Sequence, residues 1–131
     1  MFESSPLEPT LPAADLARAK AWYSDKLGLE PVSEDAELGS AMYEVGGSRF
    51  MVYMSEFAGT NQATAANFTV EDFDNVVDQL RAKGVQLEDV DFGEMGATVD
   101  GVITSPDGSG KGAWFKDSEG NILAVSTPPA D

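Results

Sequence analysis

Two stretches of the chain show the apolar spacing of an amphipathic helix. The first apolar stripe consists of Leu16, Ala19, Tyr23 and Leu27, and the second consists of Phe73, Val76, Val77 and Leu80. Asp15 and Asp72 are suitable N-cap residues in front of these stripes, and Gly28 and Gly84 are suitable stops behind them. The pattern therefore predicts one helix over residues 15–26 and another over residues 72–83.

Segments rich in β-branched and aromatic residues flank each helix and predict strands. In the first half of the chain these segments are Leu7–Pro12, Glu30–Val32, Ala41–Val45 and Arg49–Met54. In the second half they are Ala66–Val70, Gln86–Asp91, Thr98–Thr104, Gly112–Lys116 and Ile122–Ser126. A strand, a helix and further strands thus follow one another twice, which indicates an internal duplication of about sixty residues.

The repeat predicts two βαβββ modules, at about 7–56 and 66–127, joined by a linker over 57–65. One helix in each module covers one face of its sheet and leaves the other face free to curve. Alternation along 49–54 places Met51 and Tyr53 on one face and Val52 and Met54 on the other, and the pattern does not choose between these faces. We expect a single α+β domain over residues 1–131 with two curved mixed sheets.

Composition limits the possible partners. A chain of 131 residues, 42% of them hydrophobic, fits one globular domain. Subtracting 23 acidic residues from 8 basic ones gives a formal charge of −15. Such a charge repels nucleic-acid phosphates and anionic lipid, so we expect neither as a partner. It favours a small ligand that is cationic or neutral, or a metal cation.

Two residue types are missing, and their absence excludes several kinds of chemistry. Without Cys there is no thiolate nucleophile and no disulfide, and without His there is no imidazole base or metal ligand. The sequence also contains no secretory signal pattern and no run of 18 apolar residues, so we expect a cytoplasmic protein with no membrane partner.

Residues near both ends resemble a known family. Leu11–Leu16, Ala21-Trp22-Tyr23 and Leu27-Gly28-Leu29 are similar to the opening of the vicinal oxygen chelate superfamily, and Trp114–Leu123 is similar to its closing segment. This superfamily includes glyoxalase I, the fosfomycin- and bleomycin-resistance proteins and the extradiol dioxygenases. The resemblance implies two βαβββ modules that form a cup, a divalent metal inside the cup, and a homodimer that completes or seals it.

The resemblance also implies positions for the metal ligands, and this chain departs from them. The expected positions are Glu8, Ala65 (or Asn67 after a shift), the neighbourhood of Val52 or Tyr53, and Ala124. Alanine and valine have no lone pair to donate, and a single carboxylate is a poor anchor for a hard cation. We therefore expect a member of the family without the metal-ligand set and without a cofactor.

Several residues remain as candidates for chemistry or binding, and each also has a purely structural interpretation. Glu8 would serve as a general acid or base, or as a counter-ion, if apolar walls surround it; otherwise it is solvated near the terminus. Trp114 would stack on a planar ring or hold a cation, or it is a core aromatic. Tyr53 would donate a hydrogen bond or pack in the core, and Asn67 would contact a ligand or end a loop. The expected ligand-binding set is Glu8, Thr10, Met51, Tyr53, Asn67, Trp114, Ile122 and Ala124.

These residues support three functional hypotheses. The first is a metal-independent binding protein that sequesters a cationic or neutral compound, as the resemblance to bleomycin-resistance proteins implies. The second is a lyase- or isomerase-type enzyme in which Glu8 is the catalytic acid or base. The third is a degenerate domain that has only an interaction role.

Overall fold

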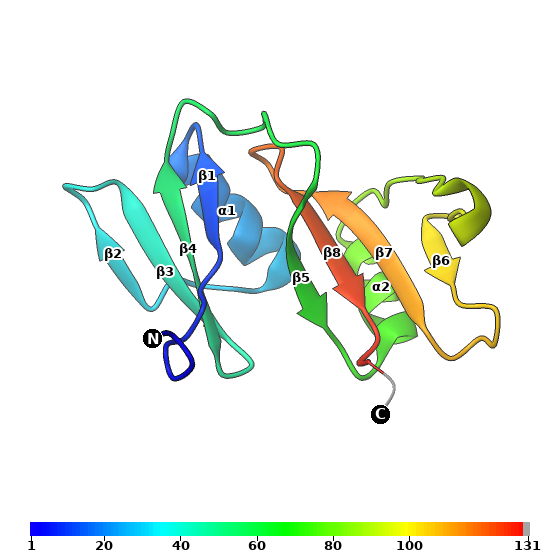
Figure 1. Ribbon diagram of the computed structural model, residues 1–131. Coiled ribbons are helices and arrows are strands. Elements are labelled where there is room, and N and C mark those ends of the chain that lie inside the picture. The colour runs from blue at the N-terminus through cyan, green and yellow to red at the C-terminus, as the bar shows by residue number, and fades with distance from the viewer. Residues whose placement is uncertain (130–131) are drawn as a thin grey trace.

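The computed structural model describes residues 1–129, which form two four-stranded sheets and two helices (Figure 1). The elements of the first half are β1 (Thr10–Ala13), α1 (Leu16–Leu27), β2 (Ser33–Asp35), β3 (Ser40–Val45) and β4 (Ser48–Met54). Those of the second half are β5 (Thr64–Thr69), α2 (Phe73–Ala82), a short 3₁₀ turn η1 (Gly93–Met95), β6 (Val102–Thr104), β7 (Lys111–Lys116) and β8 (Ile122–Ser126). No helix among these residues is long and apolar enough to cross a membrane.

The two sheets have the same topology. Their strand orders are β1-β4-β3-β2 and β5-β8-β7-β6, so in each half the first strand pairs with the last. That pairing is parallel in both sheets, and the other pairings are antiparallel. The sheets lie side by side with β1 and β5 at their adjacent edges, and both helices lie behind them in the view of Figure 1. The predicted α+β fold with two mixed sheets is confirmed.

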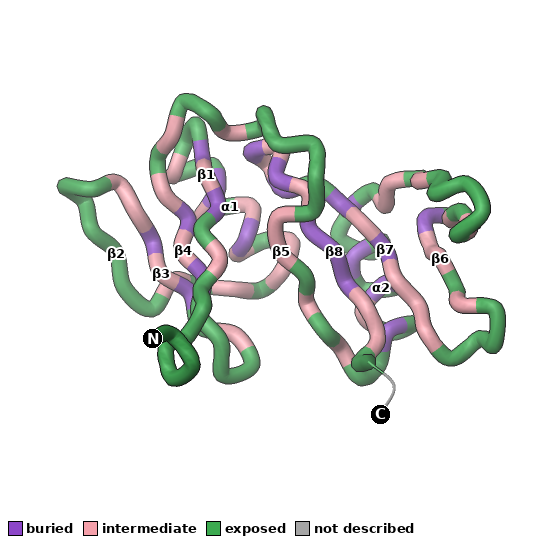
Figure 2. The backbone as a smooth tube through the Cα atoms, in the orientation of Figure 1, coloured by how far each residue is buried: buried purple, intermediate pink, exposed green. Residues whose placement is uncertain are grey.

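The core lies between the sheets and the helices. Tyr23 of α1 packs with its ring centroid 5.6 Å from Tyr43 and 5.8 Å from Phe50. Buried residues lie along the strands that face the helices (Figure 2). In β4, Phe50 and Val52 are buried on this helix side, whereas Met51 and Tyr53 are half-buried on the opposite face. The structure thereby decides the question that alternation left open. We call the sheet faces opposite α1 and α2 the open faces.

The predicted helix boundaries are close to the observed ones because the local signals are strong. The Asp15 carboxylate accepts a hydrogen bond from the Arg18 amide at 3.0 Å, and Asp72 caps α2 in the same way. Gly28 adopts a φ of 68° at the end of α1, a left-handed conformation that favours glycine.

Two predicted strands of the second half are wrong or too long. Residues 86–91 form no strand and contribute only isolated bridges, Leu87 to Phe115 and Asp91 to Ala97. The predicted strand over 98–104 shortens to β6, which pairs with residues 111–113 of β7. Because β6 occupies that stretch of the β7 edge, residues 86–91 meet β7 only near its far end, where the Glu88 amide donates to the Trp114 carbonyl at 2.7 Å.

Two strands of the first half begin later than predicted. β1 starts at Thr10, so Glu8 lies outside the strand; Pro9 has no N–H to donate to the ladder. The strand predicted at 30–32 is instead β2, three residues further on. A turn over 36–39, in which the Asp35 carboxylate accepts from the Glu37 and Leu38 amides, joins β2 directly to β3. The predicted linker over 57–65 is also too long, because β5 begins at Thr64.

Candidate functional site on the open face of the second sheet

The register of the second sheet places three of the predicted residues in one row. Asn67 pairs with Ala124, and Ala124 pairs with Trp114 on its other side. Partners in adjacent strands project from the same face, so these three side chains lie on the open face, opposite the buried Leu123 and Val125. The next row consists of Thr64, Ile122 and Lys116.

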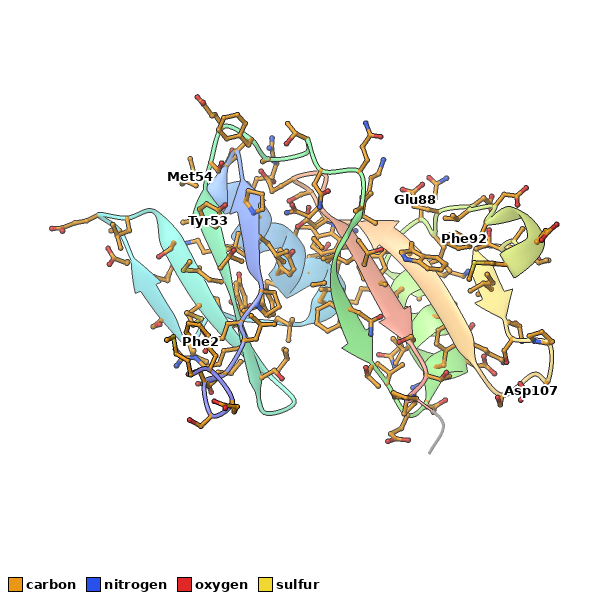
Figure 3. The ribbon with its side chains drawn as sticks, in the orientation of Figure 1. Phe2, Tyr53, Met54, Glu88, Phe92 and Asp107 are labelled. Atoms are coloured by element: carbon orange, nitrogen blue, oxygen red, sulfur yellow. The ribbon has the colours of Figure 1, made fainter. Side chains whose placement is uncertain are left out.

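A cavity of about 380 Å³ lies over this part of the open face. Its lining residues come from the end of the linker, from β5, β7 and β8, and from the segment that follows α2: Gln62, Ala63, Thr64, Glu88, Asp89, Val90, Phe92, Trp114, Lys116 and Ile122. Glu88 and Phe92 lie on the segment that runs beside β7 (Figure 3). The cavity therefore has one wall made of sheet and one made of loop.

Trp114 is the aromatic centre of the cavity. Its indole Nε1 donates a hydrogen bond to the Thr64 hydroxyl at 3.1 Å, which fixes the orientation of the ring. The Phe92 ring lies with its centroid 5.4 Å from that of Trp114, at an interplanar angle of 58°. This separation is typical of a favourable aromatic pair. Trp114 is only half-buried, so the pair leaves part of the indole open to a ligand.

The charged groups of the cavity are two carboxylates and one ammonium. Glu88 is half-buried, whereas Asp89 is exposed and its carboxylate accepts from the Gly101 amide at 3.2 Å and the Thr98 hydroxyl at 3.3 Å. Lys116 is exposed at the end of β7. The three charged lining residues therefore sum to a formal charge of −1 beside an aromatic surface, and this combination attracts organic cations.

Asn67 adds an oriented polar group to the same face. Its carboxamide Nδ2 donates to the Ser126 hydroxyl at 3.0 Å and to the Thr69 hydroxyl at 3.4 Å. Within residues 1–129 no donor reaches its Oδ1, so this oxygen is available to accept a hydrogen bond from a ligand. Ala124 lies between Asn67 and Trp114 in this row and is buried, and neither Asn67 nor Ala124 lines the cavity itself.

The other predicted site residues lie on the first sheet. Thr10 pairs with Met51, and both face away from α1, as does Tyr53. None of these three lines the cavity on the second sheet. Glu8 is exposed ahead of β1, and its carboxylate makes no hydrogen bond or ion pair with the described part of the chain. It therefore lacks the apolar surroundings that the acid–base hypothesis requires.

The residues at the implied metal-ligand positions do not fit a divalent cation. Ala124 and Ala65 have no donor atom, Val52 is buried on the helix side, and Glu8 is solvated outside its strand. The alternative positions, Tyr53 and Asn67, lie on different sheets and offer one neutral oxygen each. Across residues 1–129, no three Asp or Glu side chains are grouped so that they could hold a metal ion. We derive no chemistry through a metal.

The turn between β7 and β8 contains a buried polar cluster whose role the sequence analysis missed. Asp117, Glu119 and Asn121 are all buried. The Tyr23 hydroxyl donates to Asp117 at 2.6 Å, and the side-chain Nδ2 of Asn121 donates to the Pro12 carbonyl at 2.9 Å. Because Tyr23 and Pro12 belong to the first half, this cluster ties the two halves together. We call Arg18, Tyr23, Asp117, Glu119 and Asn121 the inter-sheet clamp.

Glu119 is the carboxylate of the clamp that pairs with a positive charge. It accepts hydrogen bonds from Arg18 Nε at 2.8 Å, Arg18 Nη2 at 2.9 Å, the Asp15 amide at 3.0 Å and the Ser118 hydroxyl at 2.7 Å. The Arg18 hydrogen bonds lower the pKa of Glu119 to about 2, against the opposing effect of burial. Burial and the neighbouring Asp117 raise the pKa of the Tyr23 phenol, so Tyr23 acts as a hydrogen-bond donor.

The sequence of the chain matches one protein family over most of its length. Residues 7–125 match the profile of the Glyoxalase/Bleomycin resistance protein/Dioxygenase superfamily. The chain belongs to this superfamily. A search of curated proteins found no sequence match.

Solved structures of this superfamily share the fold. A glyoxalase/bleomycin resistance protein from Catenulispora acidiphila DSM 44928 is similar, with a TM-score of 0.69 and 25% identity over 96% of this chain and 100% of that one. A lactoylglutathione lyase from Agrobacterium tumefaciens is similar, with a TM-score of 0.70 and 19% identity over 97% and 96%. The fosfomycin resistance protein FosX from Mesorhizobium loti is similar, with a TM-score of 0.64 and 13% identity over 96% and 93%.

Proposed function

We propose that this member of the superfamily is a metal-independent binding protein that holds a small organic cation in the cavity around Trp114. The observation that carries the proposal is the Trp114–Phe92 aromatic pair, which lies in a cavity lined by Glu88 and Asp89. An indole face attracts a cation by about 1–2 kcal/mol, depending on how far the pair is removed from water. The formal charge of −15 adds long-range attraction of the same sign.

The size of the cavity favours a compact planar group as the part of the ligand that is held. A volume of about 380 Å³ lies near the lower end of the range for small-molecule sites, which is about 300–1,000 Å³. A planar cationic ring would stack on Trp114, and a polar substituent would reach the free Oδ1 of Asn67. A larger compound, such as a cationic glycopeptide, would place one such group in the cavity and the remainder over the open face.

We further propose that two copies associate through their open faces. The first sheet carries the half-buried Met51 and Tyr53 on its open face. Apolar side chains gathered on one face favour association with another surface. A second copy that brings its first sheet over the Trp114 cavity would unite both groups of predicted residues in one cup.

Titration calorimetry tests the cation-binding proposal. A cationic glycopeptide of the bleomycin class and a small planar aromatic cation are titrated into the protein at low salt, with a neutral isostere of the small cation as a third ligand. We expect saturable binding of the cations and weaker binding of the isostere. Trp114→Ala should reduce cation affinity by about tenfold, because stacking and cation–π contact disappear together.

The matched control is Phe57→Ala, which removes an exposed aromatic residue that does not line the cavity. It should leave affinity unchanged. Absence of heat with both cations, or equal loss of affinity in both variants, would overturn the proposal. Sedimentation equilibrium tests the dimer separately, and a monomer at every accessible concentration would contradict the open-face association.

A further inference from the structure

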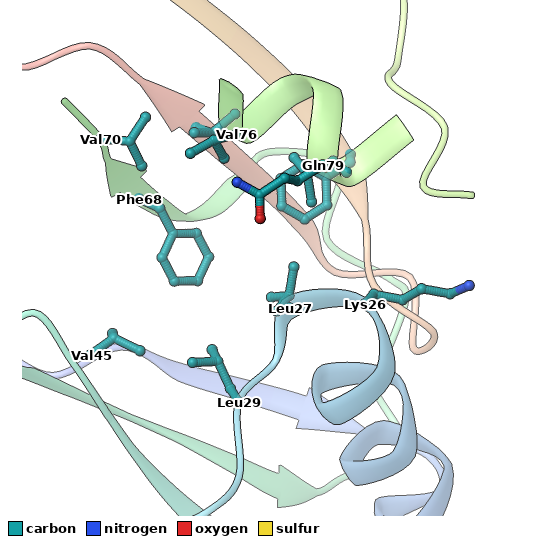
Figure 4. Close-up of a pocket in the computed structure, with 11 residues that line it drawn as sticks. Lys26, Leu27, Leu29, Val45, Phe68, Val70, Val76 and Gln79 are labelled. Atoms are coloured by element: carbon teal, nitrogen blue, oxygen red, sulfur yellow. The ribbon is translucent and has the colours of Figure 1, made fainter. Parts of the chain in front are cut away.

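A second cavity lies on the helix side of the molecule, where the two halves of the chain meet (Figure 4). It has a volume of about 270 Å³ and lies between the C-terminal end of α1 and helix α2. Its lining residues are Lys26, Leu27, Leu29, Val45, Phe68, Val70, Val76, Gln79, Leu80, Phe115 and Val125. None of these residues lines the Trp114 cavity on the open face.

The walls of this cavity are almost entirely apolar. Nine of its eleven lining residues are Leu, Val or Phe. Leu80, Phe115 and Val125 belong to the buried core, whereas the other six are only partly buried against it. These six therefore keep apolar surface that the fold itself does not cover. Covering such surface is favourable at about 25 cal/mol per Å².

The volume admits a ligand larger than a single benzene ring. A dry apolar cavity of about 150 Å³ already binds benzene. The cavity here, at about 270 Å³, has room for a substituted ring or a branched aliphatic group of similar size. It is smaller than the sites of drug-sized molecules, which start at about 300 Å³.

The two polar residues at the cavity differ in where their polar atoms lie. The Lys26 ammonium donates to the Lys83 carbonyl at 2.6 Å and lies 3.3 Å from Asp25, and Figure 4 shows it directed away from the cavity. The Gln79 carboxamide extends from α2 toward the centre of the cavity in the same view. Gln79 is exposed, and within residues 1–129 its carboxamide has no hydrogen-bond partner. The cavity thus presents one uncharged polar group and no charged one.

We propose that this cavity is a second ligand site, which binds a neutral small molecule with an apolar body and one hydroxyl or carbonyl group. The apolar body fills the space between Leu27, Val45 and Val76, and the polar group pairs with the Gln79 carboxamide. A charged ligand is excluded because burying its charge without a partner is costly. This site is independent of the cation site proposed above. It lies on the helix side instead of the open face, and it binds neutral, largely apolar molecules instead of cations.

Toluene and p-cresol are suitable probes because they differ by one hydroxyl. Each is titrated into protein carrying ¹³C-labelled Leu and Val methyl groups, and binding is followed by NMR. We expect the methyl signals of Leu27, Val45, Val76 and Val125 to shift in a saturable manner. The signals of Val32 and Val99, which are exposed elsewhere, should remain in place.

Two variants separate the apolar and polar contributions. Val76→Phe fills the cavity and should weaken both probes by at least about tenfold. Val45→Phe fills it from the other half and serves as a second test if Val76→Phe does not fold. Val32→Phe is the matched control and should leave the affinity for both probes unchanged. Gln79→Leu should weaken p-cresol by about fivefold, the value of one neutral hydrogen bond, without weakening toluene.

Four results would overturn the proposal of a second ligand site. Methyl shifts that do not saturate, or that survive both cavity-filling variants, would overturn the proposal. Loss of probe binding in Trp114→Ala would overturn it as well, because the probes would then occupy the open-face cavity. Cavity methyl signals that shift with protein concentration alone would show that a second copy of the chain covers the cavity instead.

Discussion

Replacing Glu119 with Gln tests whether the inter-sheet clamp stabilises the fold. The Glu119 side chain is fully inaccessible and accepts four hydrogen bonds, two of them from Arg18. Glutamine keeps the size and one acceptor oxygen but removes the charge. It also places an NH₂ group where the second carboxylate oxygen accepts hydrogen bonds. We expect Glu119→Gln to destabilise the protein and to remove part of its sensitivity to acid.

The lowered pKa of Glu119 determines how much stability the variant should lose. A fall from the ordinary value of 4.5 to about 2 corresponds to about 3 kcal/mol of stability at neutral pH. The Arg18 side chain is 54% exposed, so solvent screening reduces this to about 2 kcal/mol. A carboxyl group with a lowered folded-state pKa stabilises the fold above its unfolded-state pKa. That contribution is therefore present above about pH 5 and is lost as the pH falls toward about 2.

Urea denaturation at a series of pH values from 7 to 3 measures the effect. The difference in unfolding free energy between wild type and Glu119→Gln should be about 2 kcal/mol at pH 7 and should shrink at pH 3. Glu34→Gln is the matched control because it breaks an exposed ion pair with Lys20, which contributes at most about 1 kcal/mol. A difference that is the same at pH 7 and pH 3 would refute the linkage reasoning, and no difference at pH 7 would refute the clamp.

Two further pairs of variants isolate single contacts. Tyr23→Phe removes a hydroxyl that donates to a buried carboxylate at 2.6 Å and should cost about 1–3 kcal/mol in urea denaturation. Tyr43→Phe removes a buried hydroxyl that has no partner within residues 1–129 and should be neutral or stabilising; an equal loss in both would contradict this. Gly101→Ala and Gly108→Ala both place a Cβ at a φ of 79°, but only at 101 does it lie 2.5 Å from Leu87. Thermal unfolding should show Gly101→Ala to be the less stable by about 1–3 kcal/mol, and equal melting temperatures would contradict the steric argument.

The helices could be predicted from the sequence because their signals are local. Asp15 and Asp72 cap the helices by hydrogen bonds to amides three residues ahead, and Gly28 ends α1 in a left-handed conformation. Each of these interactions involves only neighbouring residues. The apolar stripes then identify the face that packs on the sheets, and Ala19, Tyr23, Phe73, Val77 and Leu80 are all buried as that pattern indicates.

The segment between α2 and β6 could not be predicted in the same way. Residues 86–91 have the composition of a strand, but a strand needs a free edge to pair with, and β6 occupies part of the edge of β7. That competition depends on positions far along the chain. The segment between α2 and β6 also contains Glu88 and Phe92, which line the cavity and which the sequence analysis did not single out. The available signal in the sequence was Phe92, an aromatic residue within an otherwise acidic run.

The predicted site residues separate into two groups for a structural reason. Alternation correctly placed Met51 and Tyr53 on one face of their strand. The observed strand pairing adds Thr10 to that face and places Asn67, Ala124 and Trp114 together on the second sheet. Alternation along a strand does not predict how the two sheets are placed relative to each other. That position is fixed by buried contacts such as Tyr23 to Asp117, which involve side chains that no strand pattern singles out.

The family resemblance and the structure together change the meaning of Ala124. The resemblance places a metal ligand at this position, so alanine first indicates only a missing metal. In the sheet, however, Ala124 lies between Trp114 and Asn67 in one row on the open face. A glutamate there would project from that face between the indole and the carboxamide. The alanine instead offers no donor atom at this position and leaves the row without a charged group between the indole and the carboxamide.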